Sequence, residues 1–416
     1  MNLIFDKKDI YAFLFGLCII VPYLNNHSLA YAVWLFTFLG TLRYKYSLVI
    51  LKAVFTFFAI LMIAIVVGIF NKNPVYEYIR DFTYLTKPII GLLAGYQLLL
   101  KREYIRPFHT IVVTGVVLAT YHLVLVGFSV VFYRIRHIHD LRWGAGYFSD
   151  YEVYALIIAL FYKRFEIKIA PKLIRIYTIL IALSVILYFS RANYIQFFIL
   201  LLALKGYFVL TKSALKKIFL VILLTLIGYS VIYNMRLSRE GKGVEALLYK
   251  IKNAPLEAFK TDVDINDWED FNDNFRSYEN ITTLKQVSKE GITAILLGQG
   301  LGSTVDIGVK MKTNDGTLVR YEAILHNAYF TVFLKSGIIG VFFCLYFIIL
   351  LIKQKKTDNL LISQINYLLL GTGVSLILAN WVLLGLFLKL DNKAVLIGFL
   401  IAYKCYLQVE KPVKNE

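Results

Sequence analysis

Apolar residues fall into long runs that are separated by short polar segments over most of the chain. A membrane-spanning helix needs roughly 20 predominantly apolar residues, and fewer where its polar ends reach the interface. The second and sixth runs are the shortest. The pattern predicts an all-α integral membrane protein with about twelve transmembrane helices, near residues 9–24, 28–42, 47–70, 81–100, 109–133, 150–163, 173–189, 191–211, 216–233, 327–352, 360–382 and 385–408.

The first run has the basic start and the apolar core of a signal peptide. Residues Val21, Pro22 and Tyr23, however, offer no small-residue cleavage site, and further apolar runs follow. We therefore expect the run to be a retained first helix.

The polar stretch 234–326 is much longer than any other connection. Long connections in compact proteins are usually functional or disordered, and the apolar content of this one favours a folded segment. The 3/4 spacing of apolar residues over 244–251 predicts an amphipathic helix, and Pro255 is expected to open another. Similar spacing over 281–287, ended by Gly291, predicts a third helix.

These patterns divide the chain into three parts. Residues 1–233 are expected to hold transmembrane helices 1–9, and residues 234–326 to form a large extracytoplasmic loop with short helices. Residues 327–416 are expected to hold helices 10–12 and a cytoplasmic tail.

Composition agrees with a chain that is dissolved in lipid. Of the 416 residues, 59% are hydrophobic and 17% are charged, whereas a soluble domain has about 25% charged residues. A soluble multidomain protein is therefore excluded, and we expect no nucleic-acid partner despite the formal charge of +18. Cys18, Cys344 and Cys405 all lie in apolar runs, so no disulfide framework or zinc motif is indicated.

Lys and Arg are concentrated in one set of alternate connections, which includes both chain ends. Cytoplasmic loops carry the excess of these residues in membrane proteins. We therefore predict that both termini are cytoplasmic and that the stretch 234–326 lies on the outer face. The same bias accounts for most of the net charge without a polyanionic partner.

Positive side chains on the predicted outer face are the first candidates for chemistry, because that face has few of them. Lys87 is predicted about two turns inside a span, just before Pro88, a residue type that kinks helices. Guanidinium groups bind phosphate oxygens bidentately and stay ionised, so a cavity that they line is suited to phosphate or diphosphate. The arginines predicted outside are Arg80, Arg134, Arg136, Arg142, Arg191 and Arg276.

Simpler explanations exist for several of these residues. Arg136 is also in a position to face lipid headgroups, Lys87 to extend toward the surface, and Arg80 to pair with Asp81. Arg191 differs, because it lies at a very tight connection between two strongly apolar runs, and there we favour a functional role.

A glycine-rich segment and a histidine end the long polar stretch. Gly298, Gly300 and Gly302 form a G-x-G-x-G pattern, but no βαβ unit surrounds it, which excludes a dinucleotide fingerprint. We expect these glycines to allow a tight turn and close backbone approach, as a phosphate-contacting loop needs. His326 directly precedes a predicted span, where an imidazole reaches both water and a membrane-anchored substrate and titrates near neutral pH.

These residues carry a resemblance to a known family. His326-Asn327, nine intervening residues and Gly337-x-x-Gly340, preceded by the glycine-rich segment, resemble the signature of the O-antigen ligase and O-antigen or capsule repeat-unit polymerase superfamily. The junction at Arg191 resembles the Ser-Arg opening of a span in that family.

Two further segments extend the resemblance, which covers about residues 140–345. Arg276 resembles the family arginine upstream of the glycine loop, and the segment from Arg142 to Glu152 resembles the entry to a middle span. Glu152 stands where an asparagine is usual. The pair Val341-Phe342 replaces the Thr-Thr pair of the ligase branch, which favours the polymerase branch.

The resemblance implies a GT-C-type glycosyltransferase that acts at the outer face of the bacterial cytoplasmic membrane. A polymerase of this kind transfers glycan from a polyprenyl-diphosphate carrier to a lipid-linked acceptor repeat unit. Such transfer needs a base for the acceptor hydroxyl and cations for the departing diphosphate. The resemblance makes His326 the candidate base and Arg191 and Arg276 the candidate diphosphate ligands.

We expect further substrate contacts from other positive side chains, from the glycine-rich segment and from the residue after the histidine. We expect no metal and no other cofactor, because two guanidinium groups can replace a divalent cation, and we interpret Asp262-x-Asp264 as a solvated loop. The expected partners are the lipid-linked donor and acceptor, the lipid bilayer and a chain-length regulator. The candidate contact residues are Arg80, Lys87, Arg136, Arg142, Gly298, Gly300 and Asn327.

Two alternatives stay open at this point. A ligase would transfer the finished glycan to a lipid-core or protein acceptor with the same base and cations. A transporter of lipid-linked glycan would show charges near mid-membrane and inverted repeats, whereas this chain places its polar groups at the outer boundary and has no internal repeat.

Overall fold

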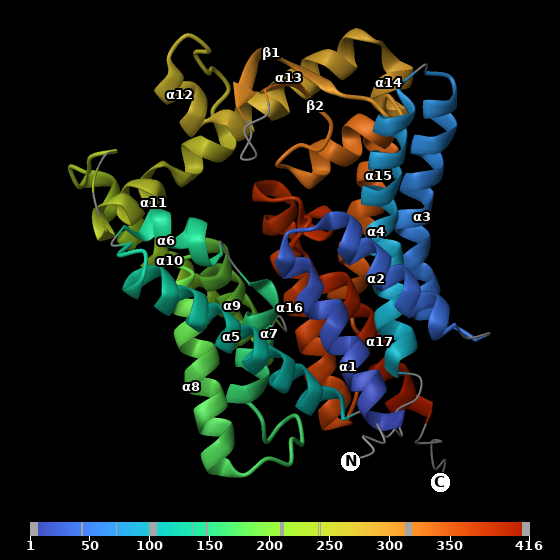
Figure 1. Cartoon of the computed structure of the whole chain (residues 1–416), viewed down its shortest axis with the longest axis vertical. Coiled ribbons are helices and arrows are strands. Elements are labelled where there is room, and N and C mark those ends of the chain that lie inside the picture. Colours follow the sequence, from blue (N-terminus) through green and yellow to red (C-terminus); the bar gives the residue numbers. More distant parts are fainter. Residues whose placement is uncertain are drawn as a thin grey trace.

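The computed structural model describes residues 7–42, 45–71, 73–99, 106–135, 137–146, 149–208, 212–239, 241, 243–312 and 318–409. About 75% of the described residues are helical, and these residues contain one small sheet, a two-stranded hairpin. The prediction of an all-α protein is confirmed at this level (Figure 1).

Every predicted apolar run contains a helix in the described part of the chain. Helix α6 was not predicted, because it has only 8 residues and contains no long apolar run. The first ten α-helices and the first 3-10 helix are α1 (Lys7–Ile20), η1 (Val21–Leu24), α2 (His27–Gly40), α3 (Leu48–Ile69), α4 (Val75–Leu99), α5 (Pro107–Val131), α6 (Ile138–Ala145), α7 (Asp150–Leu160), α8 (Pro171–Leu187), α9 (Arg191–Leu204) and α10 (Lys212–Asn234). The elements after the polar stretch are α15 (Ala328–Ile352), α16 (Leu360–Val382), η3 (Gly385–Phe387) and α17 (Lys393–Val409).

Four of the described helices, α3, α5, α15 and α16, are long and apolar enough to cross a membrane. Shorter apolar segments, such as His27–Gly40 and Arg191–Leu204, accompany them. The number of twelve spans stays a prediction.

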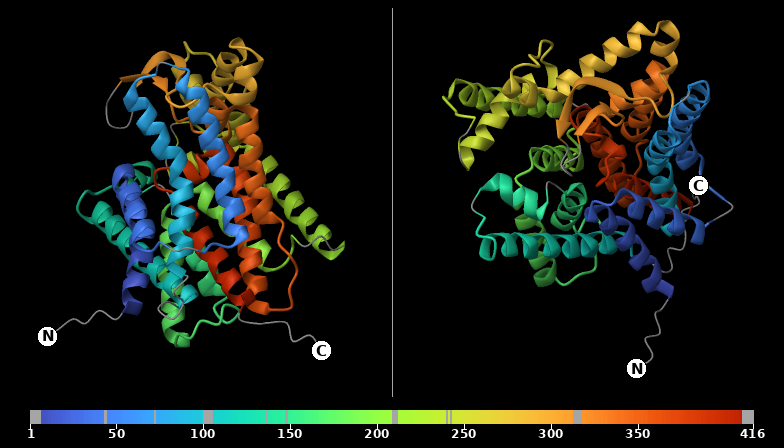
Figure 2. Two further views of the ribbon diagram at one scale, coloured as in Figure 1. Left: turned by 90° about the vertical axis from the view of Figure 1, so that its right-hand side faces the viewer. Right: turned by 45° about the horizontal axis from the view of Figure 1, so that its top comes forward.

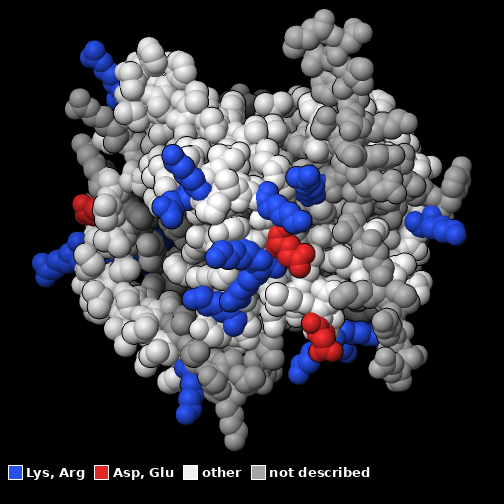
Figure 3. All heavy atoms as spheres, turned by 90° about the horizontal axis from the view of Figure 1, so that it is seen from below, with Lys and Arg blue, Asp and Glu red and all other residues white. Residues whose placement is uncertain are grey.

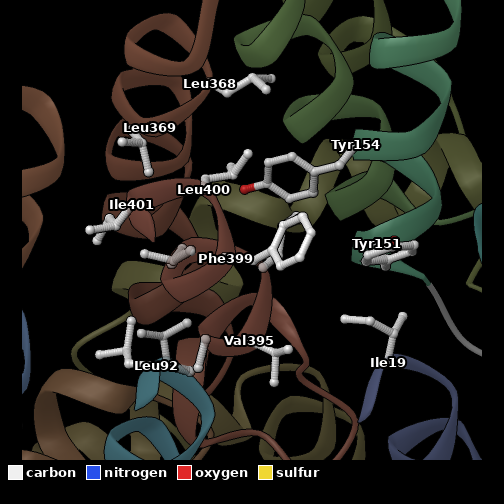
Figure 4. Close-up of a cluster of buried hydrophobic side chains, with 14 of the residues drawn as sticks. Ile19, Leu92, Tyr151, Tyr154, Leu368, Leu369, Val395, Phe399, Leu400 and Ile401 are labelled. Atoms are coloured by element: carbon white, nitrogen blue, oxygen red, sulfur yellow. The ribbon is translucent and has the colours of Figure 1, made fainter. Parts of the chain in front are cut away.

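Buried side chains from helices far apart in the sequence meet in the core of the helical bundle (Figure 4). Phe399 of α17 lies against Phe15 of α1, with ring centroids 4.4 Å apart. Nearby, the hydroxyl groups of Tyr154 on α7 and Thr372 on α16 are 2.7 Å apart. Close packing and hydrogen bonds of this kind hold helices together where lipid removes the hydrophobic driving force between them.

The polar stretch is folded, and we call its described residues 243–312 and 318–326 the cap. Two views place the cap at the end of the molecule opposite the two chain ends (Figures 1 and 2). Strands β1 and β2 pair antiparallel, with a bulge between Asp306 and Met311. The cap elements are α11 (Val244–Phe259), α12 (Trp268–Asp273), α13 (Phe275–Lys289), α14 (Ile292–Leu297), β1 (Val305–Lys312) and β2 (Leu318–Glu322).

Two of the three helices predicted in this stretch are confirmed as α11 and α13. The prediction for Pro255 is wrong, because this residue lies inside α11 and opens no second helix. Pro removes one backbone hydrogen bond of the helix, and here α11 continues past it for one more turn. Gly291 follows the end of α13 with a φ of 92°, in agreement with its predicted role as a terminator.

Residues 298–303, which we call the glycine loop, connect the cap to the helical bundle. The Leu301 N–H donates to the Ala64 carbonyl of α3 at 2.8 Å. The Asn71 side-chain amide, just after α3, donates to the Gln299 carbonyl at 2.6 Å. The backbone of the loop is therefore held against the C-terminal end of α3.

Helix α15 is broken at Gly337, which has a φ of 65° and a ψ of −164°. A Cβ atom at this position would lie 2.3 Å from the carbonyl of Leu296. Similarly, a Cβ at Gly298 would lie 2.5 Å from the Ser336 backbone nitrogen. The two glycines therefore let α14 and the break in α15 approach more closely than any side chain permits.

A fully buried ion pair lies under the glycine loop. The Lys335 ammonium group of α15 is 2.5 Å from Asp81 Oδ2 of α4, and neither side chain is exposed. Asp81 also accepts a hydrogen bond from the Gly302 N–H at 2.8 Å, and Lys335 donates to the Ser303 carbonyl. One charged contact thus joins α4, α15 and the glycine loop.

We expect either Asp81→Asn or Lys335→Met to destabilise the protein by about 3–5 kcal/mol, because each change removes one partner of a fully buried ion pair. Thermal unfolding of the purified protein in detergent measures the loss. The control is Glu269→Gln, which removes a solvated partner of Arg239. A melting temperature of the Asp81 and Lys335 variants that equals that of the control would contradict this prediction.

Candidate functional site

Helix α13 carries two charged side chains that point to two different partners. Arg276 and Glu279 are three residues apart, and residues at this spacing are neighbours on a helix surface. Arg276 donates to the carboxylate of Glu257 on α11. Glu279 accepts from His326, which precedes the first residue of α15 by two positions.

His326 is held by Glu279 through both its backbone and its ring. Its N–H donates to Glu279 Oε2 at 3.1 Å, and its Nδ1 lies 3.0 Å from the same oxygen. An ionised carboxylate can only accept, so Nδ1 carries a proton and Nε2 is the ring atom left to accept one. The His326 side chain is 52% exposed, whereas that of Glu279 is 1% exposed. The arrangement is that of a solvent-accessible base oriented by a buried carboxylate.

The charge of Glu279 also sets the basicity of this imidazole. It raises the pKa of His326 above its ordinary value, while burial and the positive charge of Arg276 oppose the rise. The influence of Arg276 on the pKa means that this guanidinium group lies in the same electrostatic neighbourhood as the imidazole.

Arg191 and Arg276 both contact the carboxylate of Glu257. Arg191 Nη2 is 3.4 Å from Glu257 Oε2, and Arg276 Nη1 donates to the other oxygen, Oε1. Arg191 Nη1 also donates to the Lys250 carbonyl at 2.7 Å. Arg191 begins α9 directly after its N-cap residue Ser190, so the tight connection predicted from the sequence is confirmed.

The structure therefore brings together the three residues that the resemblance singled out. We call Arg191, Glu257, Arg276, Glu279 and His326 the Arg–Glu–His cluster. The elements that supply it are α9, α11, α13 and the start of α15, which are far apart in the sequence. The catalytic roles of His326, Arg191 and Arg276 stay predictions.

Further positive charge surrounds this cluster. The pKa of Lys250 is lowered, first by loss of water around its ammonium group and then by the positive charges of Arg142 and Arg191. The negative charges of Glu257 and Asp273 oppose this shift. Arg142, on α6, is therefore within electrostatic reach of Lys250, and substrate binding by Arg142 stays a prediction.

Arg80 lies on α4. It forms ion pairs with Glu77 and with Asp81, the latter at 3.3 Å from Nε, so the local pairing considered for it is confirmed. Burial, and then the charge of Glu279, raises the pKa of Glu322, while His326 and Arg80 oppose this rise. Arg80 is thus within electrostatic reach of the residues around His326, and substrate binding by Arg80 stays a prediction.

The expectation that Lys87 binds substrate is wrong. Its side chain is fully buried, and its ammonium group donates to the carbonyl oxygens of Leu388, Lys389 and Asp391. An ammonium group has three protons, and three carbonyls accept them. Lys87 ties α4 to the segment between η3 and α17.

The glycine loop also differs from what the sequence predicted. The close backbone approach at Gly298 and Gly300 is confirmed, but their N–H groups donate to the carbonyls of Ala294 and Lys335 at 2.7 and 3.1 Å. The N–H groups at 299, 301, 302 and 303 also donate to acceptors within the protein. No N–H of this loop is left for a phosphate, so Gly298 and Gly300 serve packing.

Asn327 is the N-cap residue of α15. Its Oδ1 accepts from the N–H groups of Tyr329 and Phe330 at 2.9 and 3.3 Å, and the residue is 1% exposed. The side chain thus fixes the start of the helix that follows His326. Direct contact of Asn327 with a substrate stays a prediction.

Arg136, another expected contact residue, lies outside the described residues. Within the described ranges, no group of three or more His, Cys, Asp or Glu side chains could hold a metal ion. Asp264, from the D-x-D pattern, accepts the Asn266 N–H at 2.9 Å in a local turn. The expectation of a metal-free reaction stays a prediction.

Two carboxylates of the cluster were not singled out from the sequence. Glu279 lies one helical turn after Arg276 in a helix that the pattern predicted, and that spacing was a usable signal. Glu257 had no such signal, because its two partners come from α9 and α13.

No protein-family model matches this chain, and no curated protein matches it either. The function proposed below therefore depends on the geometry of the Arg–Glu–His cluster and on the motif resemblance.

Proposed function

We propose that the chain is a membrane glycosyltransferase that polymerises glycan repeat units carried on polyprenyl diphosphate. One observation carries the proposal: His326, Arg191 and Arg276 converge from distant parts of the sequence around α13. A base and a pair of guanidinium groups are the two elements that glycosyl transfer from a diphosphate requires.

The geometry supports a direct division of roles. His326 Nε2 accepts the proton of an acceptor sugar hydroxyl, and that oxygen forms a bond to the anomeric carbon of the donor. The bond from this carbon to the diphosphate oxygen breaks, and the electron pair leaves with the diphosphate. Arg191 and Arg276 stabilise the departing charge with bidentate, charge-assisted hydrogen bonds. No metal and no other cofactor takes part in these steps.

We place the cluster on the outer face of a bacterial cytoplasmic membrane, with both termini cytoplasmic and about twelve spans in a GT-C-like arrangement. Most charged side chains visible on the face near the chain ends are Lys or Arg (Figure 3). Such an excess is typical of a cytoplasmic surface, and the cap lies at the opposite end of the molecule.

The partners in this proposal are the lipid-linked donor, the lipid-linked acceptor and a chain-length regulator. A ligase is the second candidate, because the same base and arginines would serve another acceptor. The pair Val341-Phe342, where the ligase branch has Thr-Thr, favours the polymerase.

Reconstitution with a polyprenyl-diphosphate-linked oligosaccharide tests the function directly. Lengthened glycan on the lipid supports the polymerase. Transfer only to a foreign lipid-core or protein acceptor identifies a ligase, and translocation without transfer identifies a transporter.

We expect His326→Ala to lower the polymerisation rate by about 10²–10⁴-fold, the usual contribution of a positioned base. Glycan length on gels and the amount of protein in the membrane are measured together. The control is His109→Ala, a histidine near the start of α5 and far from the cluster in sequence. A normal chain-length distribution in the His326 variant would exclude this residue as the base.

We expect Arg191→Lys and Arg276→Lys each to lower kcat/KM by about ten- to hundred-fold. Lysine keeps the charge but loses the planar fork, and a charge-assisted hydrogen bond contributes about 1.5–3 kcal/mol. Initial rates on the lipid-linked donor provide the measurement. Arg320→Lys, on the β-hairpin and paired with Asp306, is the control. Full activity in both cluster variants would refute the diphosphate role.

We expect Glu279→Gln to shift the acidic limb of the pH profile of kcat/KM to lower pH. His326 acts as a base only when neutral, and the charge of Glu279 raises its pKa. Removal of that charge lowers the pKa, so the neutral form persists to lower pH while the maximal rate falls. A lower rate with an unmoved limb would mean that Glu279 only supports the local structure.

A further inference from the structure

The Arg–Glu–His cluster already contains a bound anion, which is the carboxylate of Glu257. Each oxygen of this carboxylate faces a different guanidinium group, that of Arg191 or that of Arg276. A phosphate oxygen pair would take the same kind of contact from the two arginines. Glu257 therefore occupies the position that the proposed function assigns to the substrate diphosphate.

The contact is accessible to solvent. The Arg191, Arg276 and Glu257 side chains are 33%, 30% and 26% exposed. Ion pairs with this degree of exposure are weak, because water screens them. An incoming anion can compete with Glu257 without first opening the protein core.

The charge balance at this position distinguishes between classes of anion. Glu257 neutralises one of the two guanidinium charges, and Arg142 and Lys250 add positive charge nearby. A singly charged anion would replace one negative charge by another and would displace a carboxylate that is already in place. An anion with two or more charges would neutralise both arginines and would therefore gain electrostatic energy.

This difference matters at a membrane surface. The phosphodiester headgroups of ordinary phospholipids carry one negative charge on the phosphate, and they are far more abundant than any lipid-linked diphosphate. A bare pair of guanidinium groups at the lipid boundary would bind them readily.

We propose that Glu257 is a specificity-determining residue that excludes singly charged phosphodiester headgroups from the arginine pair and admits diphosphates. The inference rests on the proposed function, because it names how the same site selects its substrate class. Diphosphate binding displaces the Glu257 carboxylate toward solvent and leaves both arginines on the ligand.

The position of Glu257 in α11 fits this displacement. The residue lies in the last turn of the helix, two positions after Pro255 and two before the final residue, Phe259. Pro255 has no N–H, so the end of this helix lacks one of its backbone hydrogen bonds. The Glu257 carbonyl, however, accepts from the Ser277 hydroxyl at 3.1 Å. The backbone is thus anchored to α13 while the side chain is free to swing out.

Binding measurements on the full-length protein in an uncharged detergent test the inference. The two ligands are farnesyl diphosphate and dihexanoyl phosphatidylglycerol, and the quantity is the ratio of their dissociation constants. We expect wild type to prefer the diphosphate strongly and Glu257→Gln to lower this preference at least tenfold, mainly by tighter phosphatidylglycerol binding. Glu269→Gln, a matched change in another exposed ion pair of the cap, should leave the ratio unchanged.

A second variant covers the case in which Glu257→Gln does not fold. Glu257→Asp keeps the charge but shortens the side chain, so that it cannot bridge both arginines, and we expect an intermediate ratio. A wild-type ratio in either variant would overturn the inference. An equal loss of both affinities in Glu257→Gln would also overturn it, because Glu257 would then only hold the arginines in place.

Other results of the same measurements would refute the proposed function itself. If wild type does not bind farnesyl diphosphate, or binds it equally well after Arg191→Lys and Arg276→Lys, the diphosphate site itself is refuted. If wild type binds it through the arginines but Glu257→Gln keeps the preference, only the selectivity of Glu257 is refuted.

Discussion

The buried ion pair between Asp81 and Lys335 determines how the cap is held over the helical bundle. Both charges are removed from water, so the pair persists only because further groups satisfy them. These groups include Arg80 of α4, which also pairs with Asp81, and the Gly302 N–H and the Ser303 carbonyl of the glycine loop. The loop, helix α14 and the first half of α15 therefore have one fixed arrangement, and the start of α15 is where His326 and its cap residue Asn327 lie.

The two carboxylates of the Arg–Glu–His cluster differ in their exposure to solvent and in the residues that they hold. Glu279 is buried, and it holds His326 through the backbone and the ring while it raises the pKa of the imidazole. Glu257 is partly exposed, and it is shared by two arginines that come from α9 and α13. The first carboxylate is suited to permanent orientation of a base, and the second to exchange with an anion from solution.

Much of the fold follows from local patterns, because an apolar run of roughly 14–25 residues is too long for a typical strand and indicates a helix. The tight connection at Arg191 and helix α13 were both predicted from such patterns. The motif resemblance pointed to His326, Arg191 and Arg276, which do meet in space. In contrast, the role of Lys87 depends on three carbonyls about 300 positions later in the chain, and no local pattern contains that information.

Contacts between residues far apart in the sequence also explain why the predictions for the glycine loop and for Pro255 were wrong. The G-x-G-x-G pattern correctly indicated close backbone approach at Gly298 and Gly300, but the acceptors that take their N–H groups include the carbonyl of Lys335 beyond the hairpin. Pro255 was expected to begin a helix, since proline favours first turns. The Glu257 carbonyl accepts from the Ser277 hydroxyl of α13, and this contact anchors α11 beyond Pro255.

The break at Gly337 divides α15 into two pieces. The piece before the break is bonded to the glycine loop through the carbonyls of Leu334 and Lys335, while the piece after it packs among the apolar helices. The first piece ends near Lys335, whose ammonium group is paired with Asp81 of α4, so this piece cannot tilt with the cap without breaking a fully buried ion pair. Because His326 lies just before this piece, the same ion pair also sets the position of the imidazole relative to the helical bundle.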